Sequence, residues 1–184
     1  MGYVKKYKPF LVFLAKFFLT YLVLGIAYQY YLSRYDEKKN EVDPITISVA
    51  NQSEQLMVLF GVNVKTRMHE SQPSIKVFYN YDYVARIIEG CNAISVMILF
   101  AAFVVAFSGK WRQTLLFILF GVVLIHVLNV ARIALLCSAI YHFPEYEHFL
   151  HSVIFPLFIY SVVFILWVIW VNKFSKYAKK PARA

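Results

Sequence analysis

Apolar residues in this chain gather into long runs, and the polar and charged residues lie in the segments between them. A helix needs about 20 mainly apolar residues to cross the hydrocarbon core of a bilayer. Four runs approach or exceed that length and predict membrane spans at about residues 9–32, 91–108, 113–141 and 149–171. The first run is longer than the apolar core of a signal peptide and lacks a small-residue cleavage site, so we expect an uncleaved anchor. The pattern predicts an all-α polytopic membrane protein, with residues 1–184 in a single membrane domain.

The acidic residues are confined to two of the segments that connect the spans, of which 33–90 is nearly neutral, with eight acidic and seven basic residues. All ten acidic residues lie between residues 36 and 89 or in the loop 142–148, whereas basic clusters lie near both ends of the chain and in the turn 109–112. Basic segments stay on the cytoplasmic side of a membrane. We therefore expect both termini and the turn to be cytoplasmic (N-in/C-in). The acidic loop and the segment 33–90 are then extracytoplasmic.

The segment 33–90 is the one sizeable stretch outside the predicted spans. Its amphipathic part, residues 45–62, predicts a helix that lies at the interface or packs over the spans. Residues 74–83 alternate between apolar and polar and predict a short strand or hairpin. This ordered extracytoplasmic segment is either a connecting cap or a surface that docks a substrate.

The composition excludes a water-soluble protein. The chain is 60% hydrophobic and 16% charged, whereas soluble domains have about 45–50% apolar and about 25% charged residues. A net charge of +9 favours a nucleic-acid ligand in a soluble protein, but a DNA-binding stripe is not interrupted by long apolar runs. We expect membrane lipid, and no nucleic acid, among the partners.

Several polar residues stand at the ends of the predicted spans or inside them, where ionisable groups are functional candidates. Cys91 begins the second span shortly after Glu89, Asn129 and Arg132 lie in the third, and His151 lies just inside the fourth. With the expected orientation, Cys91, Arg132 and His151 meet in the outer third of the membrane. Asn129 shares a helix face with Arg132, since three residues separate them.

These residue types suit the cleavage of a peptide bond. A cysteine at a helix N-terminus is activated because the positive end of the dipole stabilises its thiolate. A histidine takes up the thiol proton and delivers it to the leaving amine, and the donors of Arg132 fit the oxyanion of a tetrahedral intermediate. We expect Asn129 to orient Arg132 or His151, and Glu89 to orient the substrate or His151.

Other interpretations remain open. The chain could be a non-catalytic scaffold subunit of a secretion or surface-polymer apparatus, with Cys91 as a packing residue. Cys137 is expected to pack and to point away from the site, about 140° round the helix from Arg132, and a Cys91–Cys137 disulfide is the alternative. His148 and His151 have a spacing that can ligate zinc, although the motif His-Glu-x-x-His is absent. We predict no metal and no cofactor.

Two short segments and one histidine resemble the exosortase/archaeosortase family. The segments are Glu89-Gly90-Cys91-Asn92-Ala93 and Asn129-Val130-Ala131-Arg132-Ile133, and the histidine is His151. The short chain and the run Glu-Gly-Cys-Asn-Ala-Ile-Ser are most similar to the short bacterial exosortase F (XrtF) of Bacteroidetes. The resemblance covers residues 85–160 closely. Many members of the family have about eight spans, so the four predicted here depart from the pattern.

The resemblance implies a membrane-embedded cysteine protease or transpeptidase in which Cys91, Arg132 and His151 are catalytic. Its substrates would be secreted proteins with a C-terminal tripartite signal, made of a recognition motif, a hydrophobic span and a basic tail. The enzyme would lie in the cytoplasmic (inner) membrane with its active site facing the periplasm. There it would cleave the signal and transfer the protein to a cell-surface acceptor whose nucleophile the sequence leaves open.

Overall fold

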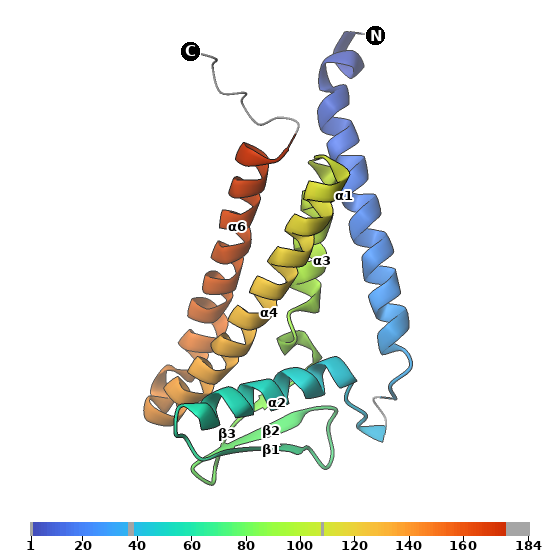
Figure 1. The fold of residues 1–184 in the computed structure, drawn as a ribbon. Coiled ribbons are helices and arrows are strands. Elements are labelled where there is room, and N and C mark those ends of the chain that lie inside the picture. Colours follow the sequence, from blue (N-terminus) through green and yellow to red (C-terminus); the bar gives the residue numbers. More distant parts are fainter. Residues whose placement is uncertain (1, 37–38, 108, 176–184) are drawn as a thin grey trace, which may run out of the picture.

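In the computed structural model, long helices stand side by side and a layer of helix and sheet closes one end (Figure 1). The structure describes residues 2–36, 39–107 and 109–175, with side chains from residue 7 onward. The upright helices are α1 (Gly2–Leu32), α3 (Ile94–Ala106), α4 (Trp111–His142) and α6 (Phe155–Lys173). The closing layer holds α2 (Pro44–Leu59), β1 (Val64–Met68), β2 (Ile75–Tyr79) and β3 (Asp82–Ile87). We call this layer the sheet end; α1 begins and α6 ends at the opposite end (Figure 1).

Within the described residues, three helical segments are long and apolar enough to cross a membrane, at Tyr7–Leu32, Trp111–His142 and Pro144–Lys173. They coincide with the predicted first, third and fourth spans. The predicted second span is helical only over Ile94–Ala106. These 13 residues extend about 20 Å, less than the thickness of about 30 Å of a hydrocarbon core. The prediction of four full spans is therefore not confirmed.

α3 is short because its first residues adopt other backbone conformations. Glu89–Cys91 forms a turn of 3₁₀ helix, η2. Ala93 then has a φ of 64°, which lies in the left-handed region and cannot belong to a right-handed helix. The apolar pattern of the sequence runs on through this break, so hydropathy alone placed the start of the helix too early.

α2 confirms the amphipathic helix predicted over residues 45–62. Its start is fixed by Asp43, whose Oδ1 accepts a hydrogen bond from the N–H of Thr46 over 3.0 Å, and by Pro44 in the first turn. The helix lies across α4, where His126 Nε2 and Gln52 Oε1 are 2.6 Å apart. This contact fixes the sheet end on the middle of α4.

The sheet is antiparallel in the order β1-β2-β3. Its second hairpin, β2 with β3, confirms the strand or hairpin predicted over residues 74–83. Asn80 and Tyr81 connect the two strands with φ angles of 49° and 74°, as tight two-residue turns require. The all-α prediction is wrong in this respect, because a mostly helical chain here includes a three-stranded sheet.

Two clusters of buried apolar side chains hold the elements together. One lies between α2, the sheet and the last third of α4, and includes Val49, Val77 and Ile133. The other joins α3, α4 and α6 around Phe100. At Gly121 in α4 an added Cβ would lie 2.3 Å from the Phe100 ring. The glycine therefore allows α3 and α4 to approach each other closely.

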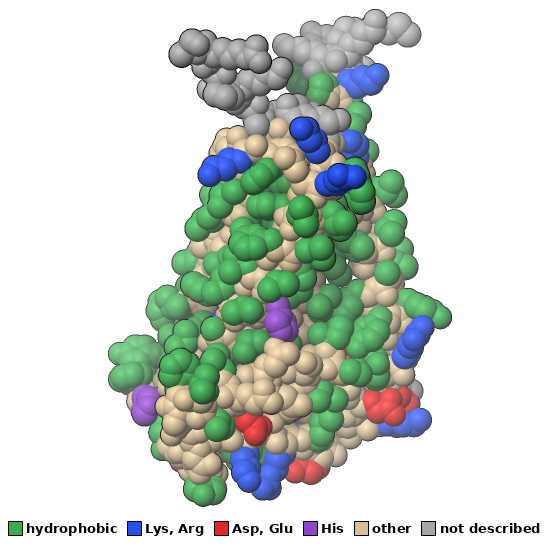
Figure 2. All heavy atoms as spheres, in the orientation of Figure 1, with side chains coloured by type: hydrophobic (Ala, Val, Ile, Leu, Met, Phe, Trp, Pro, Cys, Tyr) green, Lys and Arg blue, Asp and Glu red, His purple; other side chains and the backbone are tan. Residues whose placement is uncertain are grey.

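The surface between the two ends is apolar. Large hydrophobic side chains are exposed along α1, α4 and α6, and Figure 2 shows them between charged groups at either end. The described acidic residues belong to the sheet end or to the loop and short helices between α4 and α6. Lys110, Arg112 and Lys173 lie at the opposite end. This distribution suits a chain whose helices contact lipid.

Candidate active site

A cavity of about 480 Å³ lies where β3, the last third of α4 and the segment before α6 meet. Its lining includes Cys91, Arg132 and His151. The structure thus brings the three predicted residues, which come from three separate parts of the chain, to one cavity. Asn129 and Glu89 are not among the lining residues, but Asn129 bonds to the backbone of Cys91.

Two hydrogen bonds fix the backbone at Cys91. Its N–H donates to the carbonyl of Ile88 over 2.9 Å, which closes the η2 turn. Asn129 Nδ2 donates to the Cys91 carbonyl over 2.7 Å. Asn129 is 1% exposed, so the protein interior holds this donor in place. We expected Asn129 to orient Arg132 or His151; the bond that the structure shows is to the backbone of Cys91.

We expected Cys91 to lie at the N-terminus of a helix, and this expectation is wrong. η2 ends at Cys91, and α3 begins only at Ile94, after the left-handed Ala93. The dipole of α3 therefore does not account for activation of the thiol. Two cationic side chains, Arg86 and Arg132, line the same cavity as Cys91.

Arg132 extends from α4 into the cavity, about 15 Å from the end of the helix at 1.5 Å per residue. Its Nε is buried and has no hydrogen-bond partner among the residues that the structure describes. A buried cationic donor without a partner is costly. It is thus available to bind a negative oxygen that enters the cavity.

His151 lies in a π-helical turn, Leu150–Ile154, that precedes α6. Such turns are rare in proteins as a whole. Those that occur are often found at functional sites, because they turn a side chain away from the regular helix surface. His151 is exposed, and Glu147, which lies four residues earlier, lines the same cavity. Sequence reasoning did not name Glu147 as a lining residue of this site, although its spacing of four residues from His151 was a usable signal.

Glu89 bonds to Tyr28 on α1 and is not among the residues that line the Cys91 cavity, so its expected role towards the substrate or His151 stays a prediction. Its Oε1 accepts a hydrogen bond from the hydroxyl of Tyr28 over 2.6 Å. Asn92 Nδ2 donates to the same hydroxyl over 2.8 Å and to Thr46 Oγ1 over 3.2 Å. This network anchors the Cys91 turn to α1 and α2. Sequence reasoning missed Tyr28 and Asn92, because nothing in the apolar pattern pairs residues so distant.

Cys137 does not point away from the site. It is buried and lines the same cavity as Cys91 and Arg132. Both cysteines are free thiols. Among the described residues, no group of three or more His, Cys, Asp and Glu side chains could hold a metal ion.

The comparisons with known proteins bear on the whole chain. A family model described as transmembrane exosortase (Exosortase_EpsH) matches residues 7–171. No curated protein and no solved structure matches. The matched range includes α3, α4 and the sheet end, most of α1 and α6, and every residue that lines the cavity.

Proposed function

The chain belongs to the transmembrane exosortase family, and on that premise we propose that it is a membrane-embedded cysteine protease and transpeptidase whose active site is the Cys91 cavity. Exosortases are cysteine transpeptidases, and membership of this family supports the interpretation of the chain as an enzyme. The family and the three apolar helices indicate a multi-pass membrane protein. The observation that carries the assignment is the shared cavity lined by Cys91, Arg132 and His151.

The reaction proceeds through a thioester. His151 takes up the thiol proton while Cys91 Sγ attacks the carbonyl carbon of the scissile peptide bond. The donors of Arg132 bind the oxyanion of the tetrahedral intermediate. As the intermediate collapses, the C–N bond breaks, and the leaving amine receives the proton from His151. The acyl group of the substrate remains on Cys91.

Transfer then releases the product. An acceptor nucleophile from the cell surface attacks the thioester carbonyl and gives its proton to His151. The C–S bond breaks, the acyl group is joined to the acceptor, and Cys91 recovers its proton. Asn129 is a positioning residue, because its bond to the Cys91 carbonyl holds the turn that carries the thiol.

The substrate is a secreted protein with a C-terminal recognition motif, a hydrophobic span and a basic tail, and the chain is of the exosortase F type. The cavity lies at the sheet end, where acidic and basic residues are mixed, whereas the described charged residues of the opposite end are basic. Because basic segments stay in the cytoplasm, the site faces the periplasm from the cytoplasmic (inner) membrane. Residues 1–184 act as one domain.

The test uses a secreted reporter that ends in a hydrophobic span and a basic tail taken from the same genome as this chain. Tags before and after the span report its cleavage in cells. Cys91→Ala abolishes cleavage, whereas the matched control Cys137→Ala, which removes the other thiol of the cavity, still cleaves. If Cys91→Ala cleaves at the wild-type rate, the chain is a scaffold and the proposal is wrong.

A further inference from the structure

The cavity that contains Cys91 is also lined by six consecutive residues, 83–88, from β3 and the position after it. Successive side chains of a strand point to opposite faces of the sheet. A cavity on one face therefore meets every second residue of a strand. The pairing with β2 is irregular beside Val84 and regular from Ala85 to Ile87, and a cavity that meets these regular residues in succession runs along the edge of the strand.

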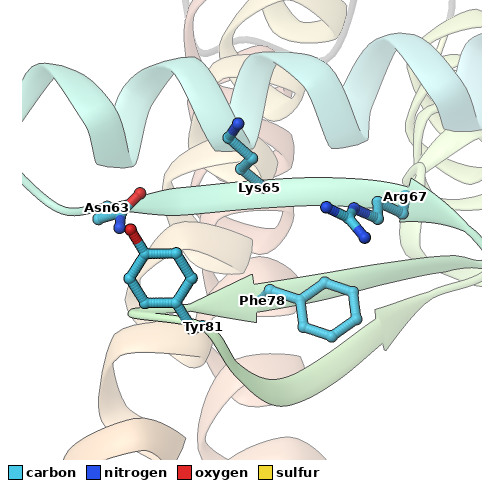
Figure 3. Close-up of a pocket in the computed structure, with 5 residues that line it drawn as sticks. All are labelled: Asn63, Lys65, Arg67, Phe78 and Tyr81. Atoms are coloured by element: carbon cyan, nitrogen blue, oxygen red, sulfur yellow. The ribbon is translucent and has the colours of Figure 1, made fainter.

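A second cavity, of about 400 Å³, shows the other arrangement (Figure 3). Along β1 and the residue before it, this cavity is lined by the alternate residues Asn63, Lys65 and Arg67. The Arg67 guanidinium carbon lies 5.8 Å from the centre of the Phe78 ring on β2. The second cavity thus lies over a face of the sheet, in contrast to the Cys91 cavity.

The bonds between β1 and β2 show in which direction the backbone of β2 points. Asn80 N donates to Asn63 O over 2.8 Å, and His69 N donates to Ser74 O over 2.9 Å. Both bonds continue the register of the two strands. Because backbone groups alternate in direction along a strand, the even-numbered residues of β2 bond to β1 and the odd-numbered residues face β3.

The same alternation identifies the backbone groups of β3 that face the cavity. Val77 pairs with Ala85, and Ile75 pairs with Ile87. The backbone groups of Ala85 and Ile87 therefore point to β2, and the N–H and C=O of Arg86 point to the opposite edge. Among the described residues, β2 is the strand that neighbours β3, and the other edge of β3 has no strand beside it.

We propose that β3 binds the substrate as an added strand, with the extended peptide segment beside the scissile bond paired to the backbone of Arg86. The proposal rests on the proposed function and names how that site holds its substrate. Open sheet edges bind extended peptides through main-chain hydrogen bonds. Six residues at about 3.3 Å each provide an edge of about 20 Å.

The position of Cys91 favours this occupant over a globular partner. Three residues, 88–90, separate the last residue of β3 from Cys91, and the same cavity continues from one to the other. A peptide paired along β3 therefore leads directly to the thiol. Main-chain pairing also holds the peptide extended, which exposes its scissile carbonyl to Cys91 on one side and to Arg132 on the other.

The first experiment compares Arg86→Pro with Arg86→Ala, using the tagged reporter. Proline removes the N–H that faces the cavity and is tolerated on an edge strand, since the bonds to β2 come from Ala85 and Ile87. Alanine removes the same side chain but keeps the N–H. Because one hydrogen bond contributes at most about 1.4 kcal/mol, or tenfold in rate, Arg86→Pro is expected to cleave up to about tenfold more slowly than Arg86→Ala.

Two further arms separate the outcomes. Cys91→Ala tests the proposed function in the same assay. If this variant cleaves the reporter, the cavity is not the active site. If Cys91→Ala is inactive while Arg86→Pro and Arg86→Ala cleave equally fast, the proposed function is supported and the proposal of an added strand is wrong. The melting temperature of Arg86→Pro in detergent, matched to that of Arg86→Ala, shows that the sheet has remained folded.

The second experiment leaves the enzyme intact. Proline is placed at each of the residues before the hydrophobic span of the reporter, with alanine at the same positions as the control. An added strand bonds to β3 through alternate residues, so proline reduces cleavage at every second position beyond the effect of alanine. Equal effects at neighbouring positions, or none, overturn the proposal.

Discussion

Replacing Asn129 by alanine removes the donor that lies 2.7 Å from the carbonyl oxygen of Cys91. The site is buried, since Asn129 is 1% exposed, so water does not readily replace the lost bond. An unsatisfied buried acceptor costs about 1–3 kcal/mol. For a chain of this size each kcal/mol lowers the melting temperature by about 2–4 °C.

The effect on catalysis is expected to be larger than the effect on folding. Without Asn129 the Cys91 turn keeps its anchors to α1 and α2 through Glu89 and Asn92, but its carbonyl is free to move. A displacement of about 1 Å at a reacting group costs up to about 100-fold in rate. Asn129→Ala is therefore expected to cleave about 10- to 100-fold more slowly than wild type, with little change in substrate binding.

The assay measures reporter cleavage in membranes at saturating reporter, together with melting in detergent. Ser138→Ala is the matched control, because it removes a polar group from the same helix that contacts Tyr79 and not Cys91. A loss confined to the rate constant supports positioning, and a parallel loss in both variants would indicate general damage to α4. Cleavage by Asn129→Ala within twofold of wild type would refute the reasoning.

Three more substitutions test other contacts. Arg132→Gln keeps a polar side chain but loses the cationic donors, and a loss of about 100-fold or more in cleavage is expected, as for a single oxyanion donor; activity near wild type would exclude that role. Tyr28→Phe leaves Glu89 Oε1 without its donor at 2.6 Å, so melting in detergent should fall by a few degrees, and an unchanged midpoint would show that this network adds no stability. Gly121→Ala places a Cβ 2.3 Å from the Phe100 ring and should destabilise the chain by about 1–3 kcal/mol; the double variant with Phe100→Leu should recover part of that loss.

The sequence predicted the helices best where long apolar runs coincide with helix length. α4 and the segment Pro144–Lys173 lie close to the predicted spans. α3 was predicted too long, because the left-handed Ala93 breaks the helix without interrupting the apolar pattern. The strand β1 was missed, since five residues of mixed polarity contain little periodic signal.

The members of the candidate site could be predicted, but most of their partners could not. Cys91, Arg132 and His151 stood out because ionisable groups are expensive in apolar runs. Asn129 and Glu89 were found in the sequence, yet their partners depend on how η2 sits between α1 and α4. The direction of Cys137 was wrong because the cavity extends round α4 to β3, so that it meets more than one face of the helix.

The central claim is that Cys91 carries the acyl group of the substrate. The direct measurement is mass spectrometry of peptides from the wild-type chain, recovered after a brief incubation of membranes with the tagged reporter. We expect the reporter fragment on the peptide that contains Cys91, released by hydroxylamine as thioesters are, and absent from Cys91→Ala. Cleaved reporter accompanied by an unmodified Cys91 at every time point, or an adduct on Cys137 instead, would contradict the account.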